Sequence, residues 1–144
     1  VYDASLPPLI AAVLRNLGSE RCLVVHGDDG LDEITTTGRT LVAELDGGAI
    51  TNYYLTPEEV GLPRAKLADL TVRTVEEAAE AVRSVLAGEE GPRRDIVLLN
   101  GGAAILVAGL AKNLKEGLAR AAESIDSGAA RKALEALVRI TNPA

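Results

Sequence analysis

The sequence predicts an α/β fold, with a small mixed sheet that contains a β-hairpin, several helices packed against it and a helical C-terminal half. Three short apolar runs lie within the first 55 positions, and two of them flank a Gly-Gly turn. Segments with helical periodicity fill most of the rest. Because 144 residues with 47% hydrophobic content can bury one core, we expect residues 1–144 to form a single unit.

The chain opens with a predicted helix and a buried strand. Asp3 or Ser5 can cap a helix whose apolar residues recur at helical spacing until Gly18. Residues 21–26 follow as a short apolar run, which is the pattern of a buried strand. This strand leads into the polar loop 27–33, and chemistry often sits at such strand ends.

Two further strands and a short helix come next. Residues 40–45 and 49–55 flank glycines that suit the tight turn of an antiparallel hairpin. Residues 56–59 combine a capping Thr, a Pro and a Glu, and Gly61 ends that short helix. Three strands are few for so many amphipathic helices. We therefore expect the native sheet to take further strands from sequence outside this chain or from a partner chain.

The remaining residues predict helices. Residues 74–87 form an amphipathic helix that starts with a capping box, and the charged residues 89–94 follow as a connector. The run 96–110 is apolar on all sides and must be buried, either as a strand followed by a helix or as one continuous helix. Two more amphipathic helices are expected, one over 113–126 and a last one that ends near Ile140.

Composition excludes several classes of partner. The formal net charge of -6 repels nucleic acid, and three Tyr as the only aromatic residues give no stacking platform, so we expect no nucleic-acid partner. The only cysteine, Cys22, allows no internal disulfide and suits a reducing cytoplasm. No membrane span or signal peptide is expected. The chain begins with Val1 rather than Met, which predicts that its natural start lies further upstream.

One segment concentrates polar side chains. Residues 26–33 hold the only histidine and four carboxylates directly after the predicted strand. Crowded carboxylates repel one another unless a cation or hydrogen-bond donors compensate. Mg²⁺ takes one or two protein carboxylates and completes its shell with water and substrate phosphates, which suits the adjacent Asp32 and Glu33. An alternative stays open on residue chemistry alone: residues 28–30 form a solvated acidic turn, and Asp32 is a cap.

No catalytic residue is assigned. The sequence lacks G-x-S-x-G, Walker A, H-E-x-x-H and G-x-G-x-x-G patterns. His26 alone is typical of a hydrogen-bonded histidine at a strand end. Gly101 and Gly102 are typical of close helix packing, and Arg93 and Arg94 of a solvated connector.

Several short motifs resemble those of the anthranilate phosphoribosyltransferases. Residues 24–27 followed by 30–34 look like the acidic magnesium motif of that family. Further segments stand in the order that this family shows: Asn100 before a run of small residues, and residues 116–117 leading to residues 125–128. The resemblance covers nearly the whole chain.

The resemblance implies a function. Members of the family bind phosphoribosyl diphosphate with Mg²⁺ and transfer its phosphoribosyl group to anthranilate in tryptophan biosynthesis. It implies that Asp32 and Glu33 are magnesium ligands, and that His26 and Gly27 lie near the substrate without a catalytic role.

The resemblance also implies that the site is incomplete. The diphosphate-binding loop, a Lys-His-Gly-Asn segment and the arginine for anthranilate precede the matching region in the family, and none is present here. We therefore expect the C-terminal portion of a catalytic domain, inactive without the missing N-terminal half or a complementing chain. A homo-oligomer is left open. So are two alternative identities: an engineered or excised structural module without ligand, and a pyrimidine nucleoside phosphorylase-like relative.

Overall fold

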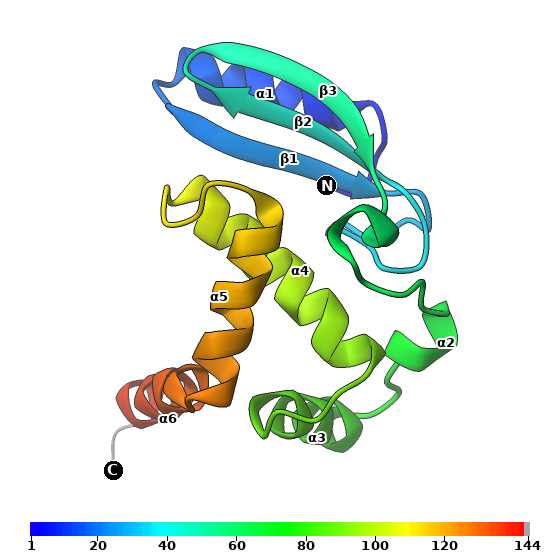
Figure 1. Ribbon diagram of the computed structural model, residues 1–144, viewed down its shortest axis with the longest axis vertical. Coiled ribbons are helices and arrows are strands. Elements are labelled where there is room, and N and C mark those ends of the chain that lie inside the picture. Colours follow the sequence, from blue (N-terminus) through cyan, green and yellow to red (C-terminus); the bar gives the residue numbers. More distant parts are fainter. Residues whose placement is uncertain (143–144) are drawn as a thin grey trace.

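A three-stranded antiparallel sheet and six α-helices are found in residues 1–142, the part of the chain that the computed structural model describes (Figure 1). The elements in chain order are α1 (Leu6–Asn16), β1 (Arg21–Gly27), β2 (Thr40–Asp46), β3 (Ala49–Leu55), the 3-10 helix η1 (Pro57–Val60), α2 (Leu67–Leu70), α3 (Val75–Leu86), α4 (Pro92–Val107), α5 (Leu114–Asp126) and α6 (Ala129–Thr141). The predicted α/β class with a hairpin and a helical C-terminal half is confirmed.

The sheet has the strand order β1-β2-β3. In the hairpin β2-β3, Asp46 lies opposite Ala49 and the turn is made by Gly47 and Gly48. Both glycines have positive φ angles, 54° and 86°, which the tight turn requires and which a side chain would disfavour. Within residues 1–142 all strand pairs are antiparallel, so the parallel pairs of the expected mixed sheet do not occur there.

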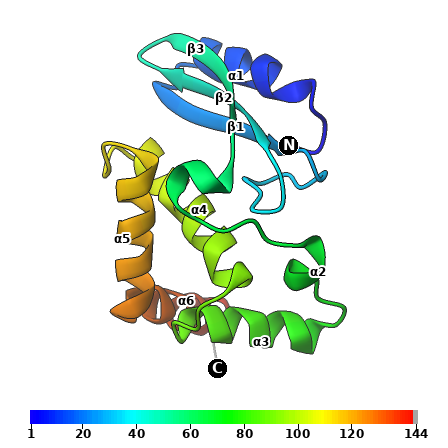
Figure 2. The same ribbon diagram turned by 45° about the vertical axis from the view of Figure 1, so that its right-hand side comes forward.

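The two faces of the sheet carry different cores. Val24 of β1 and Ala43 of β2 pack with Ala11 of α1 on one face. Leu23 and Val25 of β1 point the other way and pack against the helical layer. This alternation follows from the two-residue period of a strand. Figure 2 shows α4 running from the sheet toward α3 and α6, with α1 on the far side of the sheet.

The start of the first helix differs from the expectation. Ser5 occupies the position before α1, but its side chain does not cap the helix. The reason is local, because the Asp3 carboxylate accepts hydrogen bonds from both the backbone nitrogen and the hydroxyl of Ser5, at 2.8 and 2.7 Å. The predicted caps of the later helices are confirmed at Thr74 and Asn113, whose side chains accept from the backbone nitrogens three residues on.

Of the two alternatives for the apolar run 96–110, the structure shows the single helix, α4, which ends at Val107. α4 starts already at Pro92, so the prediction of a connector up to residue 94 is wrong from that point on. Proline suits the first turn of a helix because it has no backbone N–H to leave unpaired. Arg94 is not simply solvated either, because it donates to both carboxylate oxygens of Asp126 in α5, at 2.8 and 3.0 Å. The short helix α2 was not anticipated.

Helices α4 and α5 approach each other closely at two glycines. A Cβ on Gly102 would lie 2.7 Å from the nitrogen of Leu118, closer than side chains come to backbone. A Cβ on Gly117 would collide with the carbonyl of Gly102. The interpretation of close helix packing is confirmed at Gly102. At Gly101 a Cβ would lie 3.5 Å from the Cβ of Ala121, which is an ordinary contact. No helix in the described residues is long and apolar enough to cross a bilayer.

Candidate magnesium site

The loop that connects β1 to β2 is tied together by its own backbone. The nitrogen of Gly27 donates to the carbonyl of Leu31 at 2.9 Å, and the nitrogen of Gly30 donates to the carbonyl of Gly27 at 2.9 Å. The backbone nitrogen of Asp28 donates to the carbonyl of Arg39 at 2.8 Å, which joins the two ends of the loop. The loop therefore has a defined shape before any ligand arrives.

Asp29 organises the inside of this loop. Its carboxylate accepts hydrogen bonds from the hydroxyls of Thr35 and Thr37, and from the backbone nitrogen of Leu31 at 3.1 Å. Partial burial acts to raise the pKa of Asp29, but these hydrogen bonds outweigh it and hold the pKa below its usual value. Asp29 is thus committed to the structure of the loop and leaves no free oxygen pair for a cation.

Asp28 is committed as well. Its carboxylate accepts from Nε of Arg39 at 2.8 Å on the surface of the loop. The guanidinium of Arg39 also lies over the ring of Tyr54, 4.4 Å from its centroid. An exposed ion pair of this kind contributes only about 0–1 kcal/mol to stability. Its effect on the site is to neutralise one of the four crowded charges.

The side chains of Asp32 and Glu33 are the other two carboxylates, and both residues are exposed. In residues 1–142 neither carboxylate takes part in a hydrogen bond or an ion pair; the one bond at Asp32 is to its backbone oxygen. These two neighbours fit Mg²⁺, which prefers hard oxygen donors and needs only one or two from the protein. No group of three potential metal ligands comes together among the described residues, so a site made of protein ligands alone is not built here.

His26 and Gly27 lie at the end of β1, at the base of the loop. Nδ1 of His26 donates to the carbonyl of Val1 at 2.9 Å, so the interpretation as a hydrogen-bonded histidine at a strand end is confirmed. A Cβ on Gly27 would lie 2.5 Å from Oδ1 of Asp29 and 3.2 Å from Cβ of Thr35. Gly27 therefore makes room for the Asp29 network. That the two residues lie near a substrate stays a prediction.

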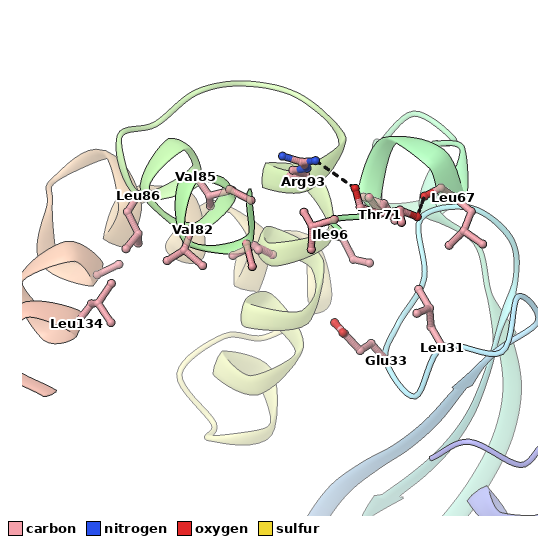
Figure 3. Close-up of a pocket in the computed structure, with 16 residues that line it drawn as sticks. Leu31, Glu33, Leu67, Thr71, Val82, Val85, Leu86, Arg93, Ile96 and Leu134 are labelled. Carbon is pink, nitrogen blue, oxygen red and sulfur yellow. Dashed lines mark hydrogen bonds between the residues drawn. The ribbon is translucent and has the colours of Figure 1, made fainter. Parts of the chain in front are cut away.

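Glu33 also stands at the rim of an open groove of about 570 Å³ (Figure 3). The groove lies between α2, α3, α4 and α6, and its lining is mostly apolar, with Leu67, Val82, Ile96 and Leu134 among its residues. Arg93 borders it too, but donates to the carbonyls of Asp69 and Thr71. Such a lining suits apolar side chains rather than diphosphate. A diphosphate group would therefore not bind inside the groove, and Glu33 contributes a carboxylate at its edge.

Two features of the site were missed in the sequence. The role of Asp29 had a signal, because three consecutive threonines, 35–37, follow the acids and are natural donors to a carboxylate. Asn100 stood out only as part of the family resemblance, which gave it no role. It bonds to the backbone of Ile34, 66 positions away, and no local pattern predicts such a pairing.

Comparison with known proteins shows which family the chain is similar to. Residues 1–131 match the family described as glycosyl transferase family, a/b domain. Anthranilate phosphoribosyltransferase of Moorella thermoacetica is 54% identical over 138 residues, which are 96% of this chain and 41% of that protein. The same enzyme of Parvibaculum lavamentivorans is 53% identical over 99% of this chain and 42% of that protein.

Solved structures give the same picture. The anthranilate phosphoribosyltransferase of Thermus thermophilus superposes with a TM-score of 0.85 at 44% identity, over 96% of this chain and 40% of that one. The Saccharomyces cerevisiae enzyme in complex with PRPP and Mg has a TM-score of 0.82 at 30% identity, over 94% of this chain and 39% of that one.

The chain thus spans about two fifths of the length of these relatives. The resemblance to anthranilate phosphoribosyltransferases that the sequence motifs indicated is confirmed. The chain belongs to the glycosyl transferase family, whose a/b domain its residues 1–131 match.

Proposed function

We propose that this chain supplies the magnesium-carboxylate part of an anthranilate phosphoribosyltransferase active site, in which Asp32 and Glu33 bind Mg²⁺. One observation carries the proposal. Of the four carboxylates in the loop between β1 and β2, Asp28 and Asp29 are committed to internal partners, whereas the adjacent residues Asp32 and Glu33 are exposed. The similarity to a relative solved in complex with PRPP and Mg supports the choice of ion.

The chemistry follows from charge. Bound Mg²⁺ would offset the negative charge that develops on a departing diphosphate. Asp32 and Glu33 hold the ion through oxygen atoms and take no part in proton transfer. The backbone bonds of the loop and the Asp29 network hold the backbone close to these two acids. Substrates are phosphoribosyl diphosphate and anthranilate, in tryptophan biosynthesis.

The surface supports a second element of the proposal, that the rest of the active site comes from sequence that this chain does not span. An apolar groove of about 460 Å³ runs between β1 and α4, lined by residues such as Val25 and Val107. It lies beside the outer edge of β1, where the carbonyl of Val25 accepts from the amino group of Val1 at 2.6 Å. Large apolar side chains are exposed on α1 and α6, including Leu9 at 60% and Ile140 at 72%.

Extended apolar surfaces of this kind mark contacts with further protein. We propose that the part of the relatives' length that precedes this region covers them. That part would carry the phosphate-binding loop and the contacts to anthranilate. The chain would then be the C-terminal portion of the catalytic domain.

A complementation assay tests the proposal. The chain is mixed with a polypeptide that holds the part of the Moorella thermoacetica relative outside the matched region, and phosphoribosyl-anthranilate formation is measured. We expect no transfer by the chain alone, transfer by the mixture, and loss of transfer when Asp32→Asn and Glu33→Gln are combined. Transfer by the chain alone would contradict the half-site. An associated but inactive mixture would contradict the function itself.

A further inference from the structure

We infer that Asn100 of α4 is a positioning residue for the Asp32–Glu33 pair, an inference that rests on the proposed function. Asn100 lies in the helix, 66 positions from the loop, and clamps the residue that follows Glu33. Its Oδ1 accepts from the backbone nitrogen of Ile34 at 2.9 Å. Its Nδ2 donates to the backbone carbonyl of the same residue at 2.9 Å.

The side-chain amide of Asn100 bonds to the backbone of Ile34 in the way that the backbone of a neighbouring strand would. A primary amide offers an acceptor and a donor side by side, so it satisfies both backbone groups of one residue at once. The second hydrogen on Nδ2 has a partner too, because it donates to the carbonyl of Ile96, one turn earlier in α4, at 3.0 Å. Both donor positions of the amide are thus occupied, and only one orientation of the side chain allows it.

The side chain of Ile34 adds a second anchor at the same point. It is 2% exposed and belongs to the core cluster that includes Leu98 and Leu99 of α4. Ile34 is therefore fixed by its backbone and by its side chain. Glu33 is one peptide bond away, so this contact fixes the position of the backbone that directly follows Glu33.

The two acids consequently stand between two fixed points. Before them, the nitrogen of Leu31 is held by the carboxylate of Asp29 at 3.1 Å. After them, Ile34 is held by Asn100. A two-residue span between such anchors has few backbone conformations, which limits the positions that the two exposed carboxylates can take. Residues that orient metal ligands in this way change metal affinity by about 10–100-fold when they are replaced.

The test is a Mg²⁺ titration of the 144-residue chain, followed by the amide resonances of residues 32 and 33. In Asn100→Leu, which has a similar shape and no hydrogen-bonding group, we expect the dissociation constant to rise by about 10–100-fold. Asn100→Ser is a milder variant with the same expected direction, in case the leucine variant does not fold. In both, the amide hydrogen of Ile34 should lose protection from exchange, while the amide of Gly27 should keep it.

Asn113→Ala is the matched control. It also removes a hydrogen-bonding asparagine, the one that caps α5 by accepting from the nitrogen of Glu116 at 2.9 Å, but it leaves the loop contacts untouched. We expect this control to bind Mg²⁺ with the wild-type constant. Equal weakening in the control would mean a general loss of stability and would overturn the role of Asn100.

Two further outcomes separate the inference from the proposed function. Folded Asn100 variants that bind Mg²⁺ as the wild type does would overturn the role of Asn100 alone. A wild-type chain whose resonances at residues 32 and 33 do not respond to Mg²⁺ would overturn the proposed function, and the positioning role with it.

Discussion

Gly102 in α4 and Gly117 in α5 touch through their backbones, with no side chain between them. A Cβ on Gly102 would come within 2.7 Å of the Leu118 nitrogen and 2.9 Å of the Gly117 carbonyl carbon. This contact fixes α4 against α5. Since Asn100 sits about half a turn before Gly102, the same contact fixes the point at which α4 bonds to the loop between β1 and β2.

Two neighbouring glycines in α4 should respond to alanine with opposite signs. Gly102→Ala forces a methyl group into backbone atoms, and the overpacking cost of about 1–3 kcal/mol exceeds the helix-propensity gain of about 0.5–1 kcal/mol. Gly101→Ala meets only the Cβ of Ala121 at 3.5 Å, an ordinary contact, so it should stabilise by about 0.5–1 kcal/mol. Urea unfolding of both variants measures this difference. A Gly102→Ala variant as stable as Gly101→Ala would contradict the close approach of the helices.

A second glycine pair tests the shape of the loop. Gly27→Ala would place a methyl group 2.5 Å from Oδ1 of Asp29, so the Asp29 network must move, at an expected cost of about 1–3 kcal/mol. Gly38→Ala is the control in the same loop, because its methyl group would lie 3.7 Å from Cβ of Asp28. The control should be neutral or stabilise by up to about 1 kcal/mol. Equal stability of the two variants in urea unfolding would argue against the network.

The ionisation of Asp29 should make stability depend on pH in the acid range. Its pKa is lowered in the folded chain, because hydrogen bonds from Thr35, Thr37 and Leu31 outweigh the opposing effect of burial. A lowered folded pKa means that the carboxylate stabilises the fold above its unfolded pKa of about 4. That stabilisation is lost as the pH falls through the lowered folded value.

The measurement compares the wild type with Asp29→Asn in urea unfolding from pH 7 to pH 2. We expect the wild type to be more stable at neutral pH and its advantage to shrink below about pH 4. Other carboxylates titrate in the same range, so only the difference between the two chains is informative. A difference that stays constant with pH would show that the charge of Asp29 is not what its partners recognise.

Single replacements of the two exposed acids should weaken Mg²⁺ binding without unfolding the chain. A unit charge about 4 Å from another contributes about 1 kcal/mol in water and about 4 kcal/mol at an effective dielectric constant of 20. Asp32→Asn or Glu33→Gln should therefore lower the affinity at least about fivefold. Glu123→Gln, which removes an exposed acid of α5, should leave the affinity unchanged. Calorimetric titration with MgCl₂ measures the affinity of all three variants. An equal loss of affinity in all three would mean that Mg²⁺ is attracted by the overall negative charge and not by a site at these two residues.

Much of the fold could be predicted because its signals are local. The hairpin was marked by Gly47 and Gly48, and two helix starts by the side chains of Thr74 and Asn113. The start of α4 was misplaced because the charges of residues 89–94 look like a connector, whereas Pro92 and the ion pair of Arg94 favour a helix there. The bond that removed the cap at Ser5 depends on the rotamer of Asp3, which a sequence does not show.

The site was predictable in part for the same reason. Four acids in one loop were visible, and the resemblance singled out Asp32 and Glu33. Which acids are committed to the structure depends on contacts made within the folded loop, between Asp29 and the threonines and between Asp28 and Arg39. The clamp of Asn100 on Ile34 joins segments 66 positions apart, and only the fold brings them together.

Whether Asp32 and Glu33 hold Mg²⁺ for a diphosphate group is measured by the amide resonances of the chain during a Mg²⁺ titration with and without inorganic diphosphate. We expect shifts confined to residues 28–33, larger when diphosphate is present, and abolished when Asp32→Asn and Glu33→Gln are combined. An unchanged spectrum at millimolar Mg²⁺, as a structural module without ligand would give, or equal shifts in the double variant, would contradict it.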